Sequence, residues 1–255
     1  MSLQPKLFAV VMLPLVRLFL NIWDGKAHIS VCRSLLCLVE VDAAREVAVA
    51  TLDGRAYFFI SNLLKSMGLP FRSLTPYEPL DKNVKVVIST RKERAHIPFE
   101  SVLCLEDLDS ELAVAKILHM LKKPSGDDVY VIGIDPGVRI GISAFYLGEE
   151  VYKCVVYSPA KALSIVSKLL KGTPAKRKVV RVGDGNIDIA LKLVKGILDE
   201  FGRQIQVEIV DEAGTTSLVK SKPNKRSVKD LRSARLIALR QGREVTSSIL
   251  ESYGK

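Results

Sequence analysis

Apolar and polar positions alternate in short blocks along the chain, and the rhythm of these blocks changes near the middle. In the first half, four short runs rich in β-branched residues predict strands: 46–52, 71–76, 84–90 and 101–107. The segments 55–69 and 110–121 have helical character, and Ser110 is the expected N-cap of the second helix. This alternation of strand and helix predicts a small α/β domain with a parallel sheet over residues 41–124.

The second half opens with three consecutive β-rich runs instead. These runs are 129–134, 140–147 and 151–157. The segments that follow predict helix, strand, helix, strand and helix in turn: 159–170, 178–186, 187–201, 206–217 and 228–240. A polar stretch with Pro and Gly, residues 122–128, is the expected linker between the halves. The order βββαβαβα therefore defines a second domain over residues 128–250.

The N-terminal segment 7–23 is mostly apolar, but Pro14 and Arg17 interrupt it. A membrane-spanning helix needs about 20 apolar residues, and an Arg at its centre costs about 3 kcal/mol. A signal peptide would show a basic start and a small-residue cleavage site, and neither is clear here. We therefore expect residues 1–40 to form an apolar segment that packs against protein and makes no membrane contact. A start codon assigned too far upstream stays an alternative.

The positive charge of the chain is concentrated in the second half. Residues 1–127 hold 16 Lys and Arg against 14 Asp and Glu, whereas residues 128–255 hold 22 against 14. This asymmetry favours an anionic partner, and nucleic acid above all, over a merely solvated basic face. The basic residues expected to contact phosphate are Lys220, Lys222, Lys225, Arg226, Lys229 and Arg232. Aromatic residues are few there, so base stacking is not implied, and a solvated loop is the alternative.

The cysteines do not indicate a metal site. Cys32, Cys37, Cys104 and Cys154 show no paired C-x-x-C spacing, and the three histidines are scattered. Reduced, buried thiols are expected, which favours a cytoplasmic location.

Acidic residues follow the strands of the second half at places where they can meet. They are Asp135, Asp184, the pair Asp211 and Glu212, and Asp230 at the start of the last helix. If the first strand is central, the ends of strands one, four and five lie together beside that helix. Clustered carboxylates repel one another, and a divalent cation such as Mg²⁺ or Mn²⁺ relieves the repulsion. Two such ions about 4 Å apart can activate water against a scissile phosphate. The alternative is that Asp135 caps an ordinary Asp-Pro-Gly turn.

Three motifs carry a family resemblance over residues 128–245. GIDPGVRIG resembles the opening motif of RuvC resolvases, VDEAGTTS resembles the DERLTT strand end of YqgF-like proteins, and KDLRSARLIAL is similar to their last helix. The chain thus resembles the RuvC and YqgF group of the RNase H-like superfamily. The resemblance implies an α/β fold whose C-terminal domain has a mixed βββαβαβα sheet. It also implies catalytic and metal-binding roles for Asp135, Glu212, Asp230 and Asp184, with Asp211 as a further metal ligand.

The sequence departs from the family at two positions. Ala213 replaces the Arg of D-E-R, and Ser233 stands where RuvC has a second helix Asp. We therefore expect a divalent-metal-dependent nuclease that acts on structured DNA or RNA, with a catalytically inactive nucleic-acid-binding or adaptor protein as the alternative. An actin-like ATPase is disfavoured, because the chain has only one βββαβαβα unit. The first half has a near-neutral charge balance and no nucleotide-binding loop, so we expect it to be a docking or dimerisation module. Junction cutting would favour a homodimer that presents two sites.

Overall fold

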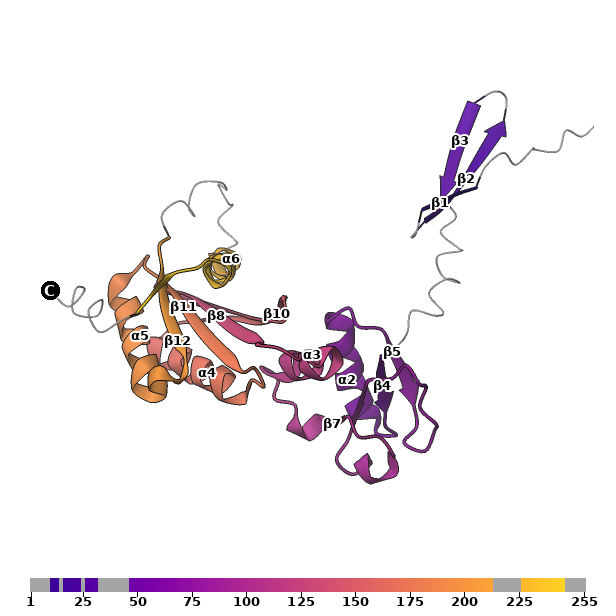
Figure 1. Cartoon of the computed structure of the whole chain (residues 1–255), viewed down its shortest axis with the longest axis horizontal. Coiled ribbons are helices and arrows are strands. Elements are labelled where there is room, and N and C mark those ends of the chain that lie inside the picture. The colour runs from indigo at the N-terminus through magenta and orange to yellow at the C-terminus, as the bar shows by residue number, and fades with distance from the viewer. Residues whose placement is uncertain (1–9, 14–15, 24–25, 32–45, 213–225, 246–255) are drawn as a thin grey trace, which may run out of the picture. The chain divides into compact units, whose positions relative to one another are not determined.

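The computed structural model describes residues 10–13, 16–23, 26–31, 46–212 and 226–245 (Figure 1). The chain divides into two compact units, Met1–Arg45 and Glu46–Lys255. In the first unit, three antiparallel strands form one sheet: β1 (Val10–Leu13), β2 (Val16–Trp23) and β3 (Lys26–Val31). None of the helices in the described ranges is long and apolar enough to cross a membrane.

The second unit begins with the parallel sheet that the sequence predicts. Its strands lie in the order β5 (Phe71–Leu74), β4 (Val47–Ala50), β6 (Val86–Ser89) and β7 (Val102–Cys104), and all neighbours are parallel. Every residue of β4 and β6 is buried, as continuous apolar runs of parallel strands require. Helix α2 (Gly54–Ser66) begins at Asp53, whose carboxylate accepts from the backbone N–H groups of Arg55 and Ala56. Two short 3₁₀ turns, η2 (Arg94–His96) and η3 (Leu105–Asp107), complete the domain's loops.

Helix α3 (Ala113–Lys122) begins later than the sequence predicts, so the expected N-cap is wrong. The Ser110 hydroxyl donates to the Glu111 carboxylate at 2.7 Å instead of capping a helix. Leu112 occupies the N-cap position because its side chain is buried in the hydrophobic core of the following domain. Tertiary packing has overridden a local capping preference. At the far end of the expected linker, Asp128 is also buried.

The remaining elements form the mixed sheet with the expected order. The three antiparallel strands are β8 (Val129–Asp135), β9 (Ile140–Tyr146) and β10 (Glu149–Val156). They are followed by α4 (Pro159–Gly172), β11 (Arg177–Gly183), α5 (Ile187–Phe201), η4 (Gly202–Gln204), β12 (Gln206–Val210), α6 (Arg226–Leu239) and the two-residue edge strand β13 (Arg243–Glu244). The strand order is β10-β9-β8-β11-β12-β13, with β8, β11 and β12 parallel. This is the RNase H-like topology, with β8 in the centre.

The helices cover both faces of this sheet. Figure 1 shows α4 and α5 on one face and α6 on the other. Helix α6 lies almost directly on the backbone of β8 and β9, because each strand has a glycine beneath it. A methyl group on Gly133 would lie 2.2 Å from the Ala234 carbonyl oxygen, and one on Gly141 would lie 2.4 Å from the Asp230 carbonyl oxygen. The glycines therefore set how close Asp230 comes to the end of β8.

Candidate active site

Three carboxylates from distant parts of the chain line one pocket at the carboxyl ends of the parallel strands. Asp135 ends β8, Glu212 follows β12, and Asp230 lies near the start of α6. The other residues that line this pocket are Gly137, Val138, Arg139, Lys229 and Ser233. Ligands of open α/β sheets bind at this edge, so the topology itself makes the pocket a candidate active site.

Asp135 has the most perturbed carboxyl group of the pocket. Burial, together with the neighbouring charges of Glu212 and Asp230, raises the pKa of Asp135 to about 6. A hydrogen bond with the Ser233 side chain and the charge of Lys229 act against this shift. The Ser at position 233, which departs from the RuvC pattern, thus supports the carboxylate that ends β8.

Glu212 is held by backbone groups of the β11 end. Its Oε1 accepts from the Gly185 backbone N–H at 3.2 Å, and its own N–H donates to Asp184 Oδ1 at 2.9 Å. A methyl group on Gly183 would lie 2.0 Å from Oε1, so this glycine leaves the space for the carboxylate. Burial raises the pKa of Glu212, the Gly185 hydrogen bond lowers it, and the Asp184 charge raises it.

Two of the five predicted acids do not line the pocket. The Asp184 backbone N–H donates to the Val210 carbonyl at 3.1 Å, and its carboxylate accepts from Glu212, so Asp184 joins the ends of β11 and β12. Asp211 is exposed. The geometry of Asp184 therefore suits a residue that positions Glu212.

Asp230 faces a cation from the protein itself. Arg139 Nη2 lies 2.9 Å from Asp230 Oδ2, and the two side chains are 25% and 17% exposed. Oδ2 is shielded from solvent and accepts no hydrogen bond within the described part of the chain. The contact is therefore ionic in character and not a directed hydrogen bond.

The donor set of the pocket suits a divalent cation in kind. Carboxylate oxygens are the ligands that Mg²⁺ and Mn²⁺ prefer, and a cation would relieve the repulsion that raises the pKa of Asp135. Among the described residues, however, no three His, Cys, Asp or Glu side chains are close enough to share one ion. Asp230 is turned to Arg139 and Glu212 to Gly185. An ion would thus require a rearrangement of side chains, while the backbone already brings them together.

The predicted basic residues are placed only in part. Lys220, Lys222, Lys225 and also Ala213 lie outside the described residues, as does the side chain of Arg226. Lys229 and Arg232 are exposed on α6, and Lys229 lines the pocket. Arg139 was not among the predicted site residues, although it lies within the GIDPGVRIG motif, on the turn that passes the same sheet edge.

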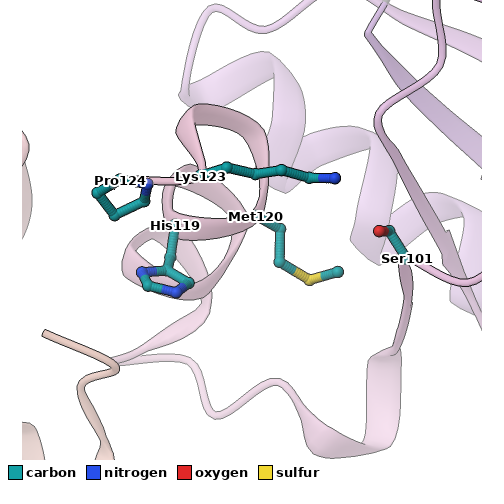
Figure 2. A pocket seen from close by; sticks show the side chains of 5 residues that line it. All are labelled: Ser101, His119, Met120, Lys123 and Pro124. Carbon is teal, nitrogen blue, oxygen red and sulfur yellow. The ribbon is translucent and has the colours of Figure 1, made fainter. Parts of the chain in front are cut away.

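A second pocket lies beside the C-terminal end of α3. It is lined by Ser101, His119, Met120, Lys123 and Pro124, and Figure 2 shows the Met120 and Lys123 side chains extending toward Ser101.

His119 at this pocket is joined to a buried acid through a tyrosine. His119 Nδ1 lies 2.6 Å from the Tyr146 hydroxyl, which donates to the Asp128 carboxylate. Burial acts to raise the pKa of Asp128, but hydrogen bonds from Tyr146 and the Lys176 N–H outweigh it and the pKa is lowered. Satisfied groups of this kind are structural, so the carboxylate pocket is the candidate site.

Comparison with known proteins gives partial matches. A family model for a response regulator receiver-like domain matches residues 46–121, the parallel-sheet domain. No curated protein matches the chain.

Solved structures match at low identity. Thermus thermophilus RuvC is 13% identical over 49% of this chain and 88% of its own, with a TM-score of 0.28. RuvC of the same organism in complex with Holliday junction substrate has the same identity and coverage and a TM-score of 0.29. The structure of Aa-Ago with externally bound siRNA is 15% identical over 65% of this chain and 35% of its own, with a TM-score of 0.25. Because these identities and TM-scores are low, the assignment of the RNase H-like fold rests on the strand order of β8–β12 alone.

Proposed function

We propose that the chain is a divalent-metal-dependent nuclease that hydrolyses phosphodiester bonds in structured DNA or RNA. The observation that carries the proposal is the meeting of Asp135, Glu212 and Asp230 in one pocket at the carboxyl edge of an RNase H-like sheet. Mutual repulsion among buried carboxylates is costly, and proteins retain such clusters chiefly at functional sites.

Asp135, Glu212 and Asp230 would hold Mg²⁺ or Mn²⁺ in this pocket. The ion, when bound, supplies activation of water and stabilisation of the leaving oxygen. The chain's own residues do the rest. Ser233 orients Asp135, Asp184 and Gly185 fix Glu212, and Lys229 adds positive charge at the rim where a phosphate would approach.

The three sequence motifs support a place in the RuvC and YqgF group. The surplus of 22 Lys and Arg over 14 Asp and Glu in residues 128–255 supports a nucleic acid as substrate. We further propose a cytoplasmic location and a docking or dimerisation role for the first half of the chain, as its near-neutral charge suggests.

A non-catalytic nucleic-acid-binding protein is the second candidate. The observation that favours it is the Arg139 contact with Asp230, since a guanidinium already compensates one of the three carboxylates. In this case the fold would bind nucleic acid without cutting it.

Cleavage assays separate the two candidates. The full chain is incubated with end-labelled four-way junction DNA, duplex DNA and hairpin RNA, with Mg²⁺, with Mn²⁺ and with chelator. We expect metal-dependent cleavage of at least one substrate and a loss of about 100-fold or more in Asp135→Asn. Asp199→Asn, an exposed acid of α5, is the matched control and should cut at the wild-type rate. Binding of these substrates without cleavage by either ion would favour the second candidate.

A further inference from the structure

Arg139 brings a positive charge into the carboxylate pocket from the turn between β8 and β9. The turn between β8 and β9 carries Val138 outward, and this side chain is 90% exposed. Arg139 lines the same pocket, but its side chain is only 25% exposed and its guanidinium lies at Asp230. A cation is therefore built into the pocket, on the same turn that presents Asp135.

The cation at Asp230 cannot be removed by a change of protonation. An Arg guanidinium stays charged at every pH at which proteins fold, so only movement of the side chain takes the charge away. Asp230 Oδ2 is shielded from solvent, and within the described part of the chain no hydrogen-bond donor is aligned with it. A divalent ion at Asp230 would stand next to the guanidinium, and two cations at one carboxylate oxygen repel each other strongly.

We propose that Arg139 competes with the divalent ion for Asp230 and leaves this carboxylate when the ion binds. This inference rests on the proposed metal-dependent function. On leaving Asp230, the guanidinium stays at the rim of the same pocket, where its planar donors match a phosphate group. Binding of the ion thereby makes the Arg139 guanidinium available to a phosphate group. The contact of Arg139 with Asp230 also explains why the three carboxylates line one pocket but do not point at a common position.

Calorimetric titration of the full chain with Mn²⁺, in the absence of nucleic acid, tests the inference. Arg139→Gln removes the competing charge while it keeps most of the side-chain length, so Mn²⁺ should bind about 10-fold more tightly. Arg177→Gln is the matched control, because Arg177 pairs with Asp127 at 3.3 Å away from the pocket. This control should leave the Mn²⁺ affinity unchanged. In the Asp230→Asn background, Arg139→Gln should no longer alter the affinity, since the competition requires the Asp230 charge.

The possible failures are distinguishable. Equal Mn²⁺ affinities of wild type and Arg139→Gln overturn the competition but leave the metal-dependent function in place. A wild type and an Arg139→Gln variant that both fail to bind Mn²⁺ overturn the function and the inference together. If Arg139→Gln does not fold, Arg139→Lys replaces it. Its ammonium is a single point charge on a shorter reach, so the Mn²⁺ affinity should rise by a smaller factor, and an unchanged affinity counts against the inference.

Discussion

The second unit has two sheets, and at their carboxyl edges the pKa values of acidic residues are shifted in opposite directions. At the edge of the four-stranded sheet, the Glu93 carboxylate accepts from the Thr51 and Thr90 hydroxyls and from the Leu52 N–H, each at 2.6 Å. Burial acts to raise the pKa of Glu93, but these donors outweigh it and the pKa is lowered. At the edge of the six-stranded sheet, burial and neighbouring carboxylates raise the pKa of Asp135 to about 6.

The difference separates an acid whose charge is satisfied by donors from one whose charge is opposed by its neighbours. Glu93 is ionised at no net cost, because three neutral donors from two parts of the chain, residues 51–52 and Thr90, satisfy it. Asp135 carries charge beside two further carboxylates, which lowers the stability of the fold and is retained where a cation or substrate relieves it. An acidic residue at a strand end is therefore not by itself evidence of a functional site. A raised carboxyl pKa adds such evidence when the residue also lines a pocket with other acids.

The comparison predicts the largest effect at Glu93. Glu93→Gln should lower the free energy of unfolding by about 3 kcal/mol, since the amide keeps only one acceptor oxygen for three donors. Urea unfolding followed by circular dichroism measures this change, and the exposed Glu100→Gln is the control. Equal stability of both variants would show that the Glu93 network does not hold this edge.

A glycine pair tests how strictly the larger sheet places its acids. Gly141→Ala should cost about 2 kcal/mol and reduce cleavage at least 10-fold, because the methyl group would push the Asp230 backbone away. Gly54→Ala at the start of α2 meets no atom within 4 Å and should leave both quantities nearly unchanged. Urea unfolding and the cleavage assay give the two readings. Full activity in Gly141→Ala would mean that the position of Asp230 is not critical.

Asp135→Asn should stabilise the protein, in contrast to Glu93→Gln. The pKa of Asp135 lies near 6 in the folded protein, against an ordinary value of 3.8. Ionisation of this carboxyl group therefore lowers the free energy of unfolding as the pH rises from about 4 through 6. In chelator at pH 7 the variant should gain about 2 kcal/mol, and the gain should vanish below about pH 4. Thermal unfolding against pH measures it. A variant that is less stable than wild type at pH 7 would contradict the repulsion.

The smallest effect is expected where the two sheets' domains are linked. Lys168 donates to Glu111 at 2.9 Å, and this bond, with that from Ser110, lowers the pKa of Glu111 to about 2. The stabilisation is present above the ordinary pKa of 4.5 and is lost as the pH falls through about 2. Because the Lys168 side chain is 42% exposed and solvent screens the pair, Glu111→Gln should cost under about 1 kcal/mol at pH 7 and almost nothing at pH 2. Urea titrations at both pH values check the difference.

Periodicity predicted most of the elements, because strands and helices bury their faces with different spacings. The order βββαβαβα and the parallel sheet of the first domain follow from it. The Ser110 cap failed because Leu112 packs into a core that no local pattern describes. The two-residue β13 has no periodicity to detect.

The sequence predicted those residues of the candidate site that stand at the end of a strand or at the start of a helix. Asp135, Glu212 and Asp230 stand where a strand or helix changes, and a central β8 brings them together. The separate role of Asp184 depends on which backbone N–H its oxygen accepts from, and a sequence does not display this. Arg139 was missed because a single Arg on a turn looks like any solvated charge until its partner is known.

The close packing of α6 against Gly133 and Gly141 affects how the newly synthesised chain can fold. Asp135 leaves the ribosome early in the synthesis of this domain, whereas Asp230 follows only after β12. Until α6 docks, the apolar face of β8 and β9 lacks its cover, and the pocket lacks one of its three acids. A nascent chain that has not reached α6 therefore cannot assemble the pocket. The same docking step that completes the fold therefore also completes the candidate site.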